Sequence, residues 1–157
     1  MKNEKLFQAV QAVRGKLCSL TEIAEKEKTT PRELVYGSIP DKLVNNAIKA
    51  YASGADKSDV YLLVDTTIFG SAKEGLLVTS NTLYADEKGE SPVKADYADI
   101  TSTEVVMTED SKGKDDYASL IIHTKNRDIR IDNYVIYKSV LKKLIDSLVA
   151  LKKSKAI

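Results

Sequence analysis

At 157 residues, the chain is long enough for one compact unit with a helical extension but too short for two large domains. Its apolar fraction of 43% and charged fraction of 30% are typical of a globular protein and exclude global disorder. Because 24 Lys and Arg residues balance 23 Asp and Glu residues, the formal charge of +1 provides no field that attracts polyanions, and we expect no nucleic-acid partner.

The cysteine count and the hydropathy pattern indicate in which cellular compartment we expect the protein. Cys18 is the only cysteine, which excludes an intramolecular disulfide and a zinc-binding thiolate cluster and suits a reducing environment. The N-terminal residues lack the apolar run of a signal peptide, and no segment reaches the roughly 20 apolar residues of a membrane-spanning helix. We therefore expect a cytoplasmic protein.

The first segment of the chain has the periodicity of an amphipathic helix. Apolar side chains recur at spacings of three and four residues, at Leu6, Val10, Val13, Leu17 and Leu20. Such a stripe must pack against other apolar groups. Packing on the chain's own core is the favoured interpretation, and a partner helix or a dimer seam is the alternative.

Further helices are predicted before residue 55. Ser19 and Glu22 have the spacing of a capping box that begins a second helix. Pro31 suits a first helical turn, and Glu33 favours the same start through the helix dipole. Residues 41–52 again place apolar side chains on one helical side. Residues 1–55 are therefore predicted to be a helical extension.

Beyond this extension the apolar period changes to two, with turn signals every several residues, which is typical of an antiparallel meander. We predict seven strands, over residues 59–64, 75–79, 82–85, 93–97, 103–108, 117–124 and 128–132. Residues 80–81 and 86–90 are expected to form turns. The charged residues 109–116 are expected to form a loop that projects into water.

One amphipathic helix is predicted at the C-terminus, beginning near Asp132 or Asn133, both favourable N-caps, and ending in cationic lysines. Its predicted apolar face consists of Ile136, Val140, Leu141, Leu144, Leu148 and Leu151. The fold class is therefore α+β, with N-terminal helices followed, in a domain over residues 56–157, by a seven-stranded antiparallel half-barrel capped by this helix.

The order of seven strands and one helix resembles the bacterial pleckstrin-homology-like (PH-like) domains over residues 58–150. The segments that carry the resemblance are DTTIFGS (65–71), GLLVT (75–79), LY (83–84) and YADI (97–100). The resemblance implies a non-enzymatic scaffold that binds lipids, peptides or proteins. Lipid-binding members use several basic residues in and after the first hairpin loop, but residues 68–80 contain only Lys73, beside Glu74. Phosphoinositide recognition is therefore not expected.

No constellation of reactive side chains is found. His123 is the only histidine, and although Ser119 precedes it by four residues, no nucleophile elbow surrounds that serine. The carboxylates of residues 109–116 lack the alternate spacing of a calcium loop. We expect no enzyme, no metal and no cofactor.

A protein-binding module with a protein partner is the leading functional hypothesis. Acidic loop residues can mimic the phosphates that a nuclease expects, so one version is an immunity protein that neutralises a toxin. Core packing with the hydroxyl at the boundary explains most of the eight tyrosines, and an exposed tyrosine patch that marks an interaction surface is the alternative. The candidate binding residues are Glu109, Asp110, Asp115, Asp116, Lys73 and Tyr117. The alternative is peripheral binding to anionic lipid through the open end of the half-barrel, aided by the lysines of the last helix. The oligomeric state is not predicted.

Overall fold

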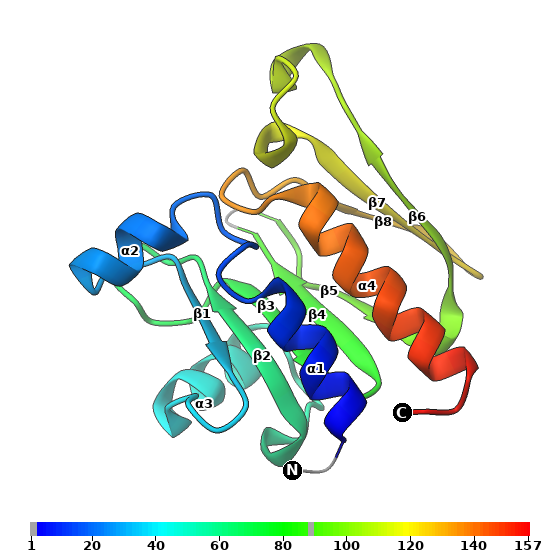
Figure 1. Cartoon of the computed structure of the whole chain (residues 1–157), viewed down its shortest axis with the longest axis horizontal. Helices are drawn as coiled ribbons and strands as arrows, with labels where there is room; N and C mark the ends of the chain where they lie inside the picture. Colours follow the sequence, from blue (N-terminus) through cyan, green and yellow to red (C-terminus); the bar gives the residue numbers. More distant parts are fainter. Residues whose placement is uncertain (1–2, 88–89) are drawn as a thin grey trace.

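The computed structural model describes residues 3–87 and 90–157 (Figure 1). Within these residues the α-helices are α1 (Glu4–Val13), α2 (Thr21–Glu27), α3 (Asp41–Ala50) and α4 (Lys138–Lys153). The first antiparallel sheet contains β1 (Arg32–Val35), β2 (Val60–Asp65), β3 (Gly75–Thr79), β4 (Thr82–Asp86) and β5 (Val93–Asp96), hydrogen-bonded in that order. The second contains β6 (Ile100–Val106), β7 (Ser119–Thr124) and β8 (Asp128–Ile131).

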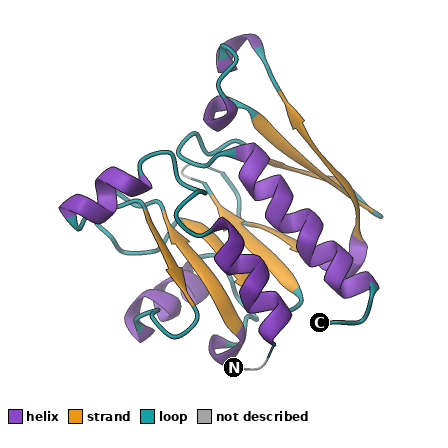
Figure 2. Ribbon diagram, in the orientation of Figure 1, coloured by secondary structure: helices purple, strands orange, loops and turns teal. Residues whose placement is uncertain are grey.

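The α+β class is confirmed, and β2 to β8 are the seven predicted strands, of which β3 has the predicted bounds and the others have shifted ends. The strands do not form one half-barrel of seven, because they divide into a five-stranded and a three-stranded sheet in the described part of the chain (Figure 2). The division falls at the short 3-10 helix η2 (Tyr97–Asp99), which separates β5 from β6. The predicted turn over residues 86–90 includes residues 88 and 89, which lie outside the described residues.

The prediction of a helix that begins at Pro31 is wrong, because the segment that follows Pro31 is the edge strand β1. Every residue of β1 pairs with β2, from Arg32 opposite Asp65 to Val35 opposite Leu62. Glu33 does not favour a helix start. Its buried carboxylate accepts hydrogen bonds from the Leu17 amide at 3.0 Å and the Thr21 hydroxyl at 2.8 Å. Tertiary pairing therefore overrides the local helix signal.

One core lies between the sheets, α1 and α4. Figure 1 shows α1 and α4 side by side, and they pack on each other; α1 contacts β2 of the first sheet, whereas α4 contacts β6 and β7 of the second. The helical stripe is buried at Leu6, Val10 and Val13, which confirms packing on the chain's own core. The predicted boundary at residues 55 and 56 falls between α3 and the 3-10 helix η1 (Lys57–Asp59), and elements on both sides of it share this core.

A second apolar cluster covers the opposite face of the first sheet, where α3 packs. Leu43 and Ala47 of α3 are buried in one cluster with Leu63 and Leu77 of the central strands. Because both faces of β2 and β3 are covered, all residues of these strands are buried. This arrangement explains why their sequences are continuous apolar runs rather than a simple alternation.

The C-terminal helix α4 begins at Lys138, later than the predicted start near Asp132. Asn133 instead accepts the amide of Val135 in a tight turn, and Glu87 accepts the amides of both Asp132 and Asn133. The side chains that α4 buries are Lys138, Leu141, Leu144, Ile145, Leu148 and Val149. Ile136 is buried ahead of the helix, whereas Val140 and Leu151 are only half-buried.

The predicted details of the second helix are also partly wrong. The helix exists as α2, but its N-cap is Leu20, and no side-chain hydrogen bond caps it, so Ser19 and Glu22 form no capping box. Leu20 is not buried with the rest of the α1 stripe and is 46% exposed. The reason is that α1 ends at Val13, so the helical spacing does not continue to residue 20.

Candidate functional site

The connection between β6 and β7 carries most of the predicted binding residues and folds into two short 3-10 turns, η3 (Glu109–Ser111) and η4 (Asp115–Tyr117). Thr108 and Ser111 form a capping box that closes η3, because each side chain bonds the other's backbone amide. Lys112 and Gly113 then adopt left-handed conformations, with φ of 51° and 75°, which reverse the chain. The connection is thus a structured turn rather than an open loop.

The four acidic residues of this connection lie in different environments, because Glu109 and Asp110 are exposed whereas Asp115 and Asp116 are half-buried. Glu109 and Asp110 are exposed, and their carboxylates make no hydrogen bond or ion pair within residues 3–87 and 90–157. The Asp115 carboxylate accepts the Ser139 amide through both oxygens, at 3.1 and 3.0 Å. Asp115 therefore caps the N-terminal turn of α4, where the helix dipole favours a negative charge.

Lys138 holds this connection to the segment that precedes α4. Its side chain is fully buried, and its ammonium donates to the carbonyl oxygens of Asp116 at 2.5 Å, Asn133 at 2.6 Å and Ile136 at 3.0 Å. Burial lowers the pKa of Lys138 from its ordinary value, because desolvation disfavours the ammonium. The carbonyl bonds, together with the carboxylate of Glu87, compensate for part of that desolvation.

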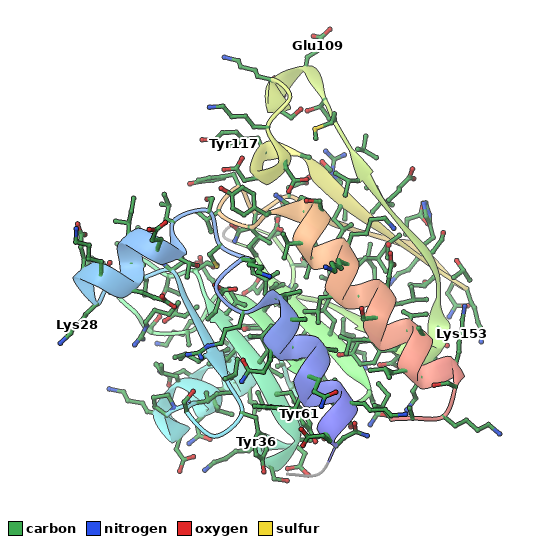
Figure 3. All side chains as sticks on the ribbon, viewed as in Figure 1. Lys28, Tyr36, Tyr61, Glu109, Tyr117 and Lys153 are labelled. Atoms are coloured by element: carbon green, nitrogen blue, oxygen red, sulfur yellow. The ribbon has the colours of Figure 1, made fainter. Side chains whose placement is uncertain are left out.

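Tyr117 directly follows Asp116, and Tyr134 directly follows Asn133. The carbonyl oxygens of Asp116 and Asn133 both accept hydrogen bonds from Lys138. The two tyrosine rings are stacked, with centroids 6.0 Å apart and planes at 29°, and the Lys114 ammonium lies 5.6 Å from the Tyr117 centroid. Tyr117 is nevertheless 48% exposed and Tyr134 is 64% exposed. Figure 3 shows Tyr117 at the margin of the molecule, next to this turn. We call this stacked couple the tyrosine pair.

Lys73 is not brought together with the other predicted site residues. It is exposed in the connection between β2 and β3, whereas residues 107–118 form the connection between β6 and β7, and no hydrogen bond or ion pair joins Lys73 to them in the described parts of the chain. The β2–β3 connection also carries Ile68 and Phe69, which are 78% and 95% exposed. The Thr30 hydroxyl donates to the Ile68 carbonyl, so this connection lies beside the start of β1.

Two residues of this candidate site were not among the predicted site residues. Tyr134 was expected at the start of the last helix, but it lies in the turn before α4. Lys138 belongs to the apolar face of α4, three residues before Leu141 and seven before Ile145. A lysine at an apolar position of a helical stripe is a detectable signal, because buried lysines are rare and need partners.

The serine and histidine of β7 do not pair with each other. Ser119 donates to Asp132 at 2.5 Å, whereas the His123 ring lies between the carboxylates of Asp128 and Glu104, at 2.7 and 2.9 Å. Among the described residues, no group of three or more His, Cys, Asp or Glu side chains is arranged to hold a metal ion.

Comparisons with known proteins provide no relative for this chain. No family model matches it, and no curated protein or solved structure is significantly similar to it. In residues 3–87 and 90–157, no helix has the length and the apolar character needed to cross a bilayer.

Proposed function

We propose that this chain is a non-enzymatic bacterial protein-binding module of PH-like fold, and that the tyrosine pair is the centre of its binding surface. The observation that carries the proposal is that two stacked aromatic rings remain about half-exposed although their backbones are fixed. Tyrosine provides a large contact area at low entropic cost, and rings held in place before binding lose little further freedom.

The PH-like assignment is supported by the order of the elements. The strands β2 to β5 lie in one sheet, β6 to β8 lie in the other, and α4 follows them. The strand β1 and the helices before β2 are additions to that order. A scaffold of this kind places its connections at the ends of the sheets, where they are free to contact a partner.

The acidic residues beside the tyrosine pair support the immunity-protein version. The carboxylates of Glu109 and Asp110 are exposed and unpaired in the described structure, so they are available to a basic protein surface. A nuclease toxin binds phosphates with such a surface, and a carboxylate can occupy the same positions. Asp115 is excluded from this role, because its carboxylate caps α4.

Affinity capture from the native host tests the proposal. Tagged wild-type protein is compared with Tyr117→Ser and with Ile68→Ser, a matched control that removes an exposed apolar side chain from another connection. We expect one protein to be enriched by the wild type and by Ile68→Ser, and to be lost from Tyr117→Ser. Equal enrichment by all three proteins would contradict the proposed surface. A 1:1 complex with the product of a neighbouring toxin-like gene would support the immunity version, and the lack of such a neighbour would count against it.

Peripheral membrane binding is the second candidate, and the exposed Ile68 and Phe69 favour it. Lys28 and Arg32 border the same hollow as these apolar side chains, which is the combination that an anionic bilayer attracts. However, Arg32 is paired with Asp65, and the C-terminal Lys153 lies on the opposite side of the molecule from Lys28 (Figure 3). Liposome sedimentation with Phe69→Ser as the comparison decides this candidate: no sedimentation of the wild type with anionic vesicles at low salt would eliminate it.

A further inference from the structure

The segment that leads into α2 lies directly against the turn that carries Tyr134. Cys18 forms an isolated antiparallel bridge with Ile136, and the Ser19 amide donates to the Val135 carbonyl at 2.7 Å. The Tyr137 amide donates back to the Leu17 carbonyl, also at 2.7 Å. These backbone contacts bring the start of α2 close to the turn of Tyr134, although more than a hundred residues separate α2 from Tyr134 in the chain.

The helix α2, which follows this contact, also exposes apolar side chains. Leu20 and Ile23 lie three residues apart on the helix and are 46% and 56% exposed, whereas Thr21 and Ala24 face the interior. In the β6–β7 connection, Met107 follows the last residue of β6 and is 51% exposed. Figure 3 shows α2 and the β6–β7 connection on either side of the turn before α4. We call the exposed side chains Leu20, Ile23, Met107, Tyr117 and Tyr134 the composite surface.

Both halves of the composite surface are fixed by buried polar side chains. Lys138 holds the half that carries the tyrosine pair through three carbonyl oxygens. Glu33, which is 5% exposed, holds the α2 half through the Leu17 amide and the Thr21 hydroxyl. A surface that is rigid before binding loses little conformational entropy when a partner docks.

The charges around the composite surface define the partner. Residues 20–28 and 107–117 together contain seven acidic residues and four lysines, an excess of three negative charges in a chain whose formal charge is +1. A second copy of the chain would bring like charges together, so self-association through this surface is disfavoured. An apolar centre with an acidic surround is complementary to a basic surface with an apolar centre.

We propose that the composite surface docks a protein segment that presents lysine or arginine side chains around an apolar centre, and that α2 supplies half of the contact. This inference rests on the proposed protein-binding function and adds to it the chemistry of the partner and the role of α2. Leu20 and Ile23 then act as apolar anchors beside the tyrosine pair, while exposed carboxylates such as Glu109 and Glu22 pair with the partner's cations at the rim.

An NMR titration with a defined probe tests this inference. The probe is a short amphipathic helical peptide of leucine and lysine, and the control is the same peptide with glutamate in place of lysine. We expect saturable amide shifts in both Leu20–Glu27 and 107–117 with the lysine peptide, and none with the glutamate peptide. Ile23→Ser should weaken the affinity about five- to tenfold, whereas Ile68→Ser should not change it.

The possible outcomes separate this inference from the function on which it rests. Saturable shifts confined to residues 107–117 and 133–135 would overturn the role of α2 and leave a protein-binding tyrosine pair intact. No saturable shift up to about 1 mM lysine peptide would overturn the basic chemistry of the partner. In both cases the affinity capture with Tyr117→Ser tests the protein-binding function independently.

Discussion

The ammonium of Lys138 donates a hydrogen bond of 2.5 Å to the backbone carbonyl of Asp116, from a side chain that is fully buried. This bond joins the first turn of α4 to the β6–β7 connection, and the same ammonium joins both to the turn at Asn133. The position of the tyrosine pair therefore depends on one interior lysine. This dependence leads to a prediction for stability.

Replacement of Lys138 by methionine should lower the free energy of unfolding by about 2–4 kcal/mol, because three carbonyl oxygens lose their donor. The matched control is Lys143→Met, since Lys143 is an exposed residue of the same helix and should have almost no effect. Urea denaturation of both variants provides the measurement. Equal losses for the two variants would contradict the stabilising role of the three hydrogen bonds of Lys138.

The pKa of the His123 imidazole should lie above its ordinary value of 6.5, because two hydrogen bonds favour the imidazolium. The bond to Asp128 has the larger effect and the bond to Glu104 the smaller one. The folded protein therefore binds this proton more tightly than the unfolded chain. The resulting stabilisation is complete below about pH 6.5 and is lost as the pH rises through the folded-state pKa. A ring-proton NMR titration measures this pKa, which should fall in Asp128→Asn and in Glu104→Gln. An unchanged pKa in both variants would show that neither contact exists in solution.

Burial raises the pKa of the Cys18 thiol to about 12, so almost no thiolate is present at neutral pH. The side chain is only 4% exposed. We expect a thiol-specific reagent to label native protein very slowly and urea-unfolded protein at the rate of a free cysteine. Rapid labelling of the native protein would indicate that the contact between the α2 segment and Ile136 opens easily.

Gly75 should tolerate no side chain, because a Cβ atom there would lie 1.8 Å from the Val64 carbonyl oxygen. Gly75→Ala is therefore expected to cost more than about 3 kcal/mol or to prevent folding. Gly15→Ala is the control that introduces backbone strain without a clash. Gly15 has a φ of +77°, but a Cβ atom there would meet no other atom within 4 Å. That variant should cost about 1–2 kcal/mol, measured by thermal or urea denaturation. Similar costs for both variants would contradict the close approach at Val64.

Local patterns were sufficient to predict most of the elements. Short apolar or alternating runs between turn signals identified β2 to β8, and helical spacing identified α1, α3 and α4. The missed strand β1 contains four residues, and its pairing with β2 is not visible in its own sequence. Glu33 was misread for the same reason, because its partners Leu17 and Thr21 are distant in sequence from any helix that begins at Pro31.

The site was predicted only in part, because its contacts are between distant residues. Tyr117 and the acidic turn were identified from residue type, but the stack on Tyr134 depends on Lys138 holding two connections together. Lys73 was included on residue type as well, and the sheet topology places it in another connection. The position of Lys138 on the apolar face of α4 was the detectable signal that this lysine is buried and joins the two connections.

The most direct test of the tyrosine pair is the affinity of the captured partner for Tyr134→Ser, measured by titration calorimetry against the wild type. Because Tyr134 is 64% exposed, its replacement should leave the fold unchanged, which circular dichroism verifies. We predict that the dissociation constant rises by at least about tenfold. A dissociation constant equal to that of the wild type would contradict the central role of the tyrosine pair in binding.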